Sequence, residues 1–349
     1  VIPAARINQS DFNFDHGSEH QILGLRATWD INDIWTLSTE TTLYYQDYFR
    51  NADNDFSAAP NGVFLRRGGS EAFEQDVELK FDSGPLRGVL GFFYTNLDAD
   101  NPTTIQSNFN GTIVSQVRDF GNKSENFAIF ANVDIDINAV PGLTLNFGAR
   151  YDNDTVSILR EEILTINGNT SVLNPREIVS TNFDAFRPEA TIRYDWSDQI
   201  STSVSVKRAY RAGGTSFDFN TNPNTPSQRV DFRPEFATNY EFAFRGEFMD
   251  GDIIANANIF YLDWKDQQVQ FDTGLSSVTR NAGRSFVTGF EANVDARFSE
   301  RFQGFAGVGY AYSEFREFTI DDPNNPGMLI ELAGNSFGEP EWTAAIGGT

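Results

Sequence analysis

Residues 239–264 carry the pattern that decides the fold, and they read N-Y-E-F-A-F-R-G-E-F-M-D-G-D-I-I-A-N-A-N-I-F-Y-L-D-W. Apolar and polar residues alternate on both sides of Asp250-Gly251, a dipeptide that favours a tight hairpin turn. A period of two with one apolar face indicates strands whose two sides meet different surroundings. We therefore expect an antiparallel hairpin from Phe236 to Trp264, with Tyr240, Phe242 and Ile259 on its apolar face.

The same alternation recurs along the chain and predicts about thirteen strands. Their connections alternate between short turns and long loops, and the long loops include residues 51–69, 98–121 and 153–182. The predicted strands run roughly 10 to 15 residues, whereas strands of a sandwich usually have about five or six. About 9–11 residues cross a bilayer at a tilt. Short turns on one rim and long loops on the other are typical of an outer-membrane barrel, with a β-sandwich as the alternative.

Composition is compatible with that architecture and excludes other classes. The chain of 349 residues has a formal net charge of −23 and no basic stripe, which argues against nucleic-acid binding. Its mean hydropathy of −0.39 fits a soluble protein, and it equally fits a barrel whose strands are half polar. The absence of Cys leaves the redox compartment open. Because Val1 is no initiator and no signal sequence follows it, we expect the chain to begin inside a longer one.

Chemistry-bearing motifs are scarce, and we expect no enzyme activity, no cofactor and no metal site. His16 and His20 are the only histidines, and the Gly-broken stretch D-H-G-S-E-H does not have the helical pattern that would let their spacing bind a metal. An enzymatic barrel would need a nucleophile or a metal set, so it ranks behind the binding and transport alternatives.

A barrel with these strands would have a mixed-charge lumen and an apolar outer surface. Such a lumen suits a hydrogen-bonded polar plug better than a charge-selective sieve, with a plain water-filled pore as the alternative. The residues expected to face the lumen are Arg150, Arg193, Lys207, Glu241, Arg245, Glu247, Glu291, Asp295 and Arg297. The residues expected to face lipid are Val133, Val204, Phe242, Phe244 and Val294.

Several segments resemble the TonB-dependent outer-membrane receptors, in the order that family shows. The segments are E-Q-D-V-E-L-K-F at 74–81, L-N-F-G-A-R-Y-D-N-D at 145–154, K-R-A-Y-R-A-G-G at 207–214, R-P-E-F-A-T-N-Y-E-F at 233–242, N-A-G-R-S-F-V-T-G-F-E at 281–291 and L-A-G-N-S-F-G-E-P-E-W-T at 332–343. Two positions depart from the family pattern: Glu78 replaces a usual basic residue, and Ala209 replaces a usual glycine.

The resemblance implies an all-β, antiparallel, up-and-down transmembrane β-barrel of about 22 strands, closed by an N-terminal plug. Residues 1–349 would be one part of that single barrel domain, with about thirteen strands present and the plug, its TonB-contacting segment and the closing strands missing. The location implied is the outer membrane of a Gram-negative bacterium, with long loops extracellular and short turns periplasmic.

The function implied is active uptake of a large, scarce solute, most often a ferric siderophore, with energy from the TonB-ExbB-ExbD system acting through the plug. Ligand recognition would fall to the long loops and the plug, and by position the candidates in this chain are Tyr210, Arg211, Trp264 and Lys265. The alternatives are a passive outer-membrane porin, which would lack a plug, and a soluble or secreted β-sheet adhesion protein, whose apolar faces would pack on each other.

Overall fold

The computed structural model describes residues 14–53, 62–218, 228–272, 277–299, 301–321 and 329–349. In this part of the chain every regular element is a strand, and no helix is long and apolar enough to cross a membrane. The strands are β1 (Asp15–Asp30), β2 (Trp35–Asp53), β3 (Gly62–Asp82), β4 (Leu86–Asp100), β5 (Thr103–Phe109), β6 (Thr112–Asp136), β7 (Leu143–Ile166), β8 (Asn169–Ser197), β9 (Ile200–Arg211), β10 (Gly214–Asp218), β11 (Gln228–Phe232), β12 (Glu235–Phe248), β13 (Ile253–Lys265), β14 (Gln268–Asp272), β15 (Ser277–Asn281), β16 (Arg284–Ser299), β17 (Phe302–Glu317), β18 (Thr319–Asp321), β19 (Leu329–Glu331) and β20 (Trp342–Gly348).

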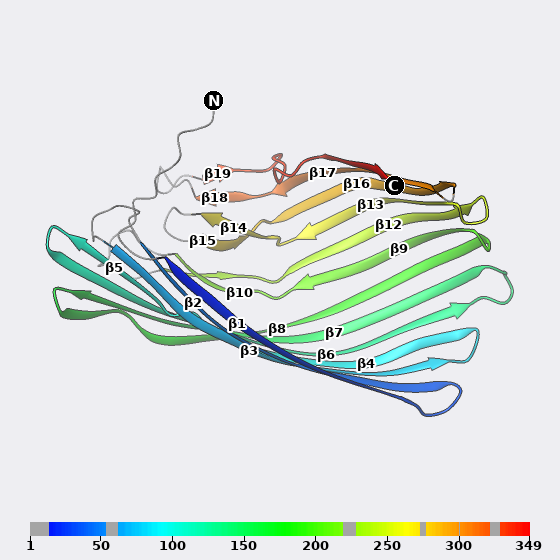
Figure 1. Cartoon of the computed structure of the whole chain (residues 1–349). Helices are drawn as coiled ribbons and strands as arrows, with labels where there is room; N and C mark the ends of the chain where they lie inside the picture. Colours follow the sequence, from blue (N-terminus) through cyan, green and yellow to red (C-terminus); the bar gives the residue numbers. More distant parts are fainter. Residues whose placement is uncertain (1–13, 54–61, 219–227, 273–276, 300, 322–328) are drawn as a thin grey trace.

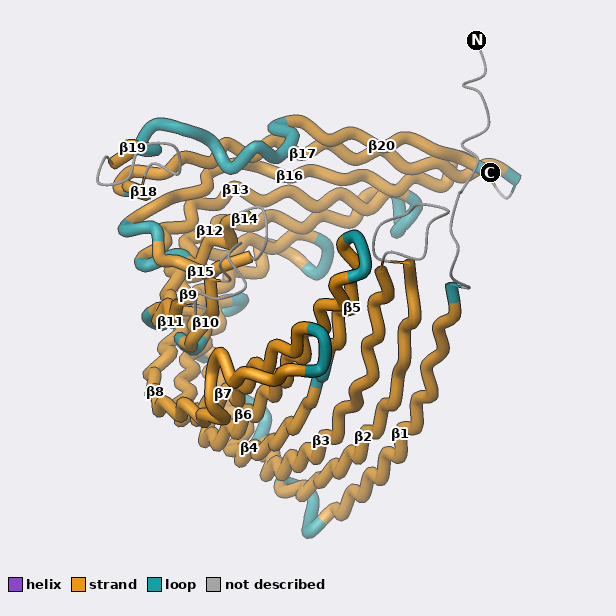
Figure 2. Tube along the Cα trace, turned by 90° about the vertical axis from the view of Figure 1, so that its left-hand side faces the viewer, coloured by secondary structure: helices purple, strands orange, loops and turns teal. Residues whose placement is uncertain are grey.

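One large sheet contains most of these strands. Its hydrogen-bonded order is β1-β2-β3-β4-β6-β7-β8-β9-β12-β13-β16-β17-β20, with β5 beside β3 and β6. The sheet curves into an open trough, and β1 and β20 lie at its two free edges (Figures 1 and 2). The predicted up-and-down antiparallel architecture of about thirteen strands is therefore confirmed, and the barrel is not closed.

The hairpin of β12 and β13 has the predicted register. Phe242 lies opposite Ile259, and Phe248 lies opposite Ile253 at the start of the turn. Met249 and Asp250 have φ values of 54° and 57°, and Gly251 has 88°. Such left-handed conformations match the twist of a hairpin, and Asp and Gly tolerate them best. The Asp-Gly signal therefore marks the turn correctly.

Three of the predicted long loops are wrong where the structure describes them, and in the first of them residues 51–53 and 62–69 belong to β2 and β3. Residues 98–121 and 153–182 are mostly strand, because β6 and β7 pair without interruption from Val114–Ile166 down to Asp136–Thr144. The overlooked signals are Asn110-Gly111 and Asn167-Gly168, where φ is 52° and 87°, and 48° and 85°. Asn-Gly is the strongest short hairpin signal. The apolar alternation is weak in these extensions, where buried positions include the polar residues Arg160 and Glu162, so period alone does not reveal them.

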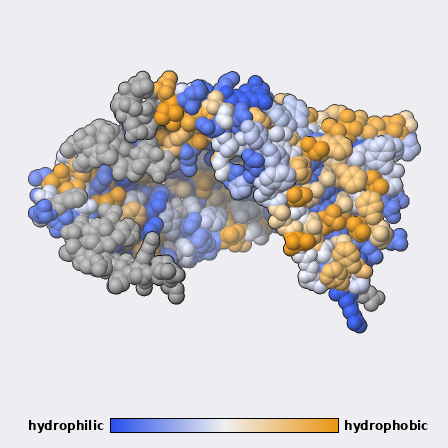
Figure 3. All heavy atoms as spheres, turned by 90° about the horizontal axis from the view of Figure 1, so that it is seen from above, coloured by the Kyte–Doolittle hydropathy of each residue, from blue (hydrophilic) through white to orange (hydrophobic). Residues whose placement is uncertain are grey.

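The apolar face of the sheet is not covered by a second layer of protein. Val204, Phe147 and Ile259 have exposed fractions of 55%, 50% and 62%. Buried apolar side chains lie instead at the long-loop end, among them Phe217 and Val278. Hydrophobic residues gather on the right-hand half of the molecule, near the short turns (Figure 3). A sandwich would bury these side chains, so this arrangement argues against that alternative.

Candidate binding surface on the concave face

The concave face of the trough is polar, because alternation along each strand places one set of side chains there. A hollow of about 590 Å³ lies over β8, β9, β12, β13 and β16. Five of the residues expected to face the lumen line it, namely Arg193, Glu241, Arg245, Glu247 and Glu291. A second hollow, of about 810 Å³, is lined by β4, β6, β7, β8 and β9 and includes Lys207. Asp295 and Arg297 line a third, near the turn after β12.

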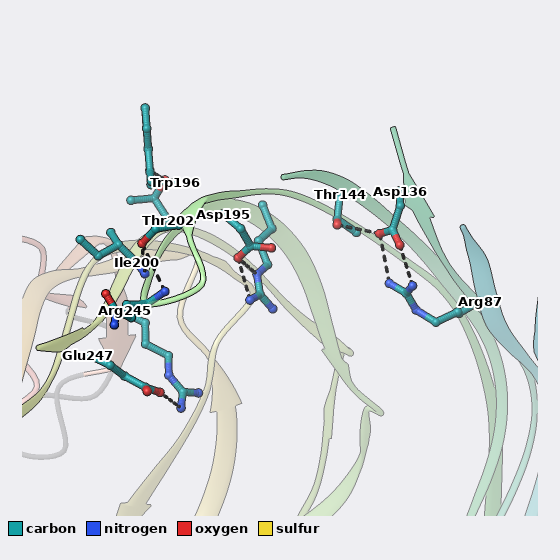
Figure 4. Close-up of polar contacts among 12 residues, drawn as sticks. Arg87, Asp136, Thr144, Asp195, Trp196, Ile200, Thr202, Arg245 and Glu247 are labelled. Atoms are coloured by element: carbon teal, nitrogen blue, oxygen red, sulfur yellow. Dashed lines mark hydrogen bonds and ion pairs between the residues drawn. The ribbon is translucent and has the colours of Figure 1, made fainter. Parts of the chain in front are cut away.

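Ion pairs stabilise the short-turn end of this face. Arg87 donates to both oxygens of Asp136, at 2.6 and 3.1 Å, and the Thr144 hydroxyl donates to the same carboxylate at 2.8 Å. Arg245 pairs with Glu247 at 3.4 Å under the arch of the sheet, whereas Trp196 points away on the other side (Figure 4).

A buried carboxylate organises the middle of the concave face. Asp152 is 3% exposed and accepts from Arg150 and Arg187, at 2.8 Å each. These two arginines lie directly opposite each other on β7 and β8, so Asp152 separates two cations that would otherwise repel. The Arg150 guanidinium also lies 4.9 Å from the centre of the Phe93 ring. The expected lumen residue Arg150 is therefore part of a fixed charge centre.

A different part of the face has carboxylates without counter-charges. Glu241 on β12 and Glu291 on β16 form no ion pair with any Lys or Arg in the described part of the chain. Asn258 lies directly opposite Glu291, and its buried side-chain oxygen has no hydrogen-bond partner among the described residues. Both glutamates line the 590 Å³ hollow. This surface is ready to accept hydrogen bonds and positive charge from a partner.

The candidate ligand residues on β9 lie at the long-loop end. The Tyr210 hydroxyl is buried beside Asp154, and burial raises the pKa of both groups. The Tyr210 and Asp154 side chains lie nearer to the long loops than Tyr151 and Phe186, the exposed aromatic residues that mark the edge of the apolar band. Arg211 is exposed and lies 3.7 Å from Glu235. Tyr210 is thus packed, whereas Arg211 stays accessible.

The candidate ligand residues on β13 point to opposite sides of the sheet. Alternation places Trp264 on the concave face, opposite Ala237, and its indole nitrogen is buried without a partner in the described part. Lys265 lies on the outer face, opposite Phe236 and Arg284. The structure does not bring the four candidates together, and their role in binding stays a prediction.

A contact network that the sequence did not indicate lies at the long-loop end. Phe217 of β10 packs beside Phe120, with ring centres 6.3 Å apart. The Arg160 guanidinium lies 4.3 Å from the centre of the Phe217 ring. Next to it the buried Glu162 accepts from Asn174 at 2.6 Å and from Arg118 at 3.3 Å. The β10–β11 hairpin is therefore folded against the concave face of β6 and β7.

No metal centre is present in the part of the chain that the structure describes. His16 and His20 lie on β1, where a strand separates residues four apart by roughly 13 Å. Both are exposed, and His20 lies 3.3 Å from the Tyr44 hydroxyl. That separation is too large for both rings to bind one ion.

Comparison with known proteins identifies the family that shares this architecture. The family described as "TonB dependent receptor-like, beta-barrel" matches residues 2–349. The ferric-pyoverdine M114 receptor PbuA of Pseudomonas sp. (strain M114) is 26% identical over 196 residues, which are 54% of this chain and 21% of that receptor.

Solved structures show the same fold. The ferric yersiniabactin uptake receptor FyuA from Yersinia pestis has a TM-score of 0.70 at 17% identity, covering 95% of this chain and 46% of that one. The siderophore receptor PiuA from Acinetobacter baumannii has a TM-score of 0.69 at 18% identity, covering 95% and 52%. The chain therefore spans about half the length of these solved structures.

Proposed function

The chain belongs to the TonB-dependent receptor β-barrel family of the outer membrane, and on that premise we propose that it is part of a receptor for ferric siderophore uptake driven through TonB. The observation that supports this most is the division of the sheet into an uncovered apolar face and a concave polar face. The relatives are named for ferric pyoverdine (PbuA), for ferric yersiniabactin (FyuA) and for a siderophore (PiuA).

The proposal includes the domain organisation. Residues 1–349 form part of one barrel domain, and a separate plug domain fills the concave side. The two free edges of the sheet support this, because unpaired strand edges need a partner in a stable protein. The unpaired glutamates Glu241 and Glu291 support it too, because a plug with basic side chains at this height would neutralise them.

Growth under iron limitation tests the transport proposal. Deletion of the gene should abolish growth on one ferric siderophore as sole iron source, and deletion of tonB should do the same. Uptake that persists without TonB and extends to unrelated small solutes would instead identify a passive porin.

The plug contact has its own test. Changing Glu241→Gln and Glu291→Gln together should loosen the plug, since each charged hydrogen bond contributes about 1.5–3 kcal/mol. We expect increased sensitivity of the cells to a bulky antibiotic that normally does not cross the outer membrane. The control is Glu247→Gln, which lies on the same face but is already paired with Arg245. Equal sensitivity in both variants would contradict this contact.

A further inference from the structure

Two hairpins at the long-loop end leave the large sheet and fold inward. β10 pairs with β11 and β14 pairs with β15, and each pair forms a two-stranded sheet of its own. Both hairpins lie inside the curve of the large sheet (Figure 2), and β15 contacts both β10 and β11. We call β10, β11, β14 and β15 the inner wall.

The two hairpins of the inner wall are packed rather than loose. The Thr279 backbone N–H of β15 donates to the Ser216 hydroxyl of β10 at 3.2 Å. Val278 of β15 is 1% exposed, and Phe217 of β10 is 6% exposed. Mobile loops have few buried apolar contacts, so burial of this degree indicates one small folded unit.

The Asn281 side chain ties the bases of the two hairpins together. Its oxygen accepts from the Arg233 backbone N–H at 2.7 Å, and its nitrogen donates to the Arg233 carbonyl at 2.9 Å. The same nitrogen donates to the Asp266 carbonyl at 2.7 Å. Arg233 connects β11 to β12, and Asp266 connects β13 to β14. One side chain therefore bonds to the backbone at the base of each hairpin.

Glu235 and Gln268 form a second tie beside the first. The Glu235 carboxylate accepts from the Gln268 backbone N–H, and Glu235 is only 7% exposed. The Gln268 side chain donates to the Ala212 carbonyl at 2.7 Å and to the Arg233 carbonyl at 3.2 Å. Glu235 also lies 3.7 Å from Arg211, the accessible ligand candidate on β9. The base of β14 is thereby linked to the start of β10 and to Arg211.

We propose that the inner wall is one rigid body, locked at its base by Asn281 and Glu235, and that it stays folded inward while a solute enters. Separation of the two hairpins would break the six bonds of Asn281 and Gln268 together and leave polar groups in a packed site unpaired. A wall that is already ordered meets a solute without the entropic cost of ordering a loop. Its place at a solute entrance rests on the proposed function, whereas its rigidity does not.

Hydrogen exchange in the full receptor in nanodiscs tests the ties. One hydrogen bond slows opening about fivefold, so N281A, which removes three, should make the amides of 277–281 exchange roughly a hundredfold faster. E235A should speed exchange of the Gln268 amide, and E235Q, which keeps an acceptor oxygen, should restore the wild-type rate. The control N182A removes an exposed amide pair with Asn153, of 3.1 and 3.2 Å, and should change neither rate. Wild-type exchange in N281A would overturn the proposal.

Electron–electron distance measurements test whether the hairpins move together. Spin labels at Gln228 on β11 and Gln270 on β14 should give one narrow distance in the wild-type background and a broad distribution in N281A. Two or more distances in the wild-type background would show hairpins that separate, and would contradict a rigid inner wall.

A cross-link tests the role during uptake. In S216C/T279C a short bismaleimide joins β10 to β15, and iron uptake is then followed over minutes with the siderophore that supports growth. Uptake should match that of the unlinked variant. Loss of uptake on linking alone would mean that the hairpins must part, and would overturn the proposal. If wild-type cells take up no iron by this receptor, the proposed function fails, and the distance measurement still decides the rigidity.

Discussion

Asp152 is the single carboxylate that two arginines of the concave face share. Its replacement by Ala leaves Arg150 and Arg187 facing each other across β7 and β8 without a counter-charge. Removing one partner of a buried pair costs about 3–5 kcal/mol. We therefore expect D152A to lower the unfolding free energy of the receptor in detergent by that amount.

The matched control is Asp195→Ala. Asp195 also pairs with an arginine, Arg193, at 2.8 Å, but its side chain is 36% exposed. Exposed pairs contribute below about 1 kcal/mol. Similar losses for the two variants would show that burial of Asp152 does not matter.

Asp154 makes the packing of the β9 end depend on pH. Burial raises the pKa of its carboxyl above the ordinary value, so the folded chain holds this proton more tightly than the unfolded chain. The packing around Asp154 is therefore most stable below the ordinary carboxyl pKa, and this contribution is lost as the pH rises through the raised value, even though the Tyr210 hydroxyl favours the ionised carboxylate and opposes the shift. Hydrogen exchange at 208–214, corrected for intrinsic rates, should be slower at acidic pH than at neutral pH. In Asp154→Asn that difference should vanish, and its persistence there would assign the effect to another group.

At the scale of elements, the two faces of one strand should respond differently to charge. Val204, Val133 and Val294 lie on the apolar face, whereas Ser203 and Asn293 lie on the concave one. An Arg at Val204 or Val294 should impair assembly by about 2–4 kcal/mol near the bilayer midplane. Arg at Ser203 or Asn293 should be tolerated. Folding yield into lipid vesicles measures this, and equal damage on both faces would contradict the facing assignment.

The hairpin of β12 and β13 shows what alternation alone can predict. Its strands, register and turn follow from period two and Asp-Gly, because a buried or lipid-facing side requires an unbroken apolar row. The extensions beyond that row were missed, although Asn167-Gly168 marks their turn.

The site was harder to predict than the strands. Arg118 and Glu162 are far apart in the sequence and meet only because β6 and β7 pair over their full length. Likewise, Phe217 on β10 packs against Phe120 and Arg160 of β6 and β7, and Tyr210 on β9 lies beside Asp154 of β7, which are contacts between strands distant in the sequence. The sequence placed Tyr210 at a strand end and said nothing of its neighbours.

For the whole molecule, the two free edges have a consequence for residues 1–349 expressed alone. β1 and β20 each present a row of unpaired backbone groups, which template association with other chains. We expect this span to aggregate in detergent, whereas the full receptor stays monodisperse on size-exclusion chromatography. A soluble monomeric form of residues 1–349 would show that the edges are protected within this span.

The most direct test of the account is spin-label accessibility along residues 236–264 of the receptor in lipid bilayers. Labels on alternate residues should be reached by oxygen dissolved in the lipid at Phe242, Phe244 and Ile259. Labels between them, at Glu241, Arg245 and Asn258, should be shielded from it and instead report a polar environment. Accessibility without a period of two, or apolar positions shielded from both lipid and water, would contradict the claim that one face of this sheet meets the membrane.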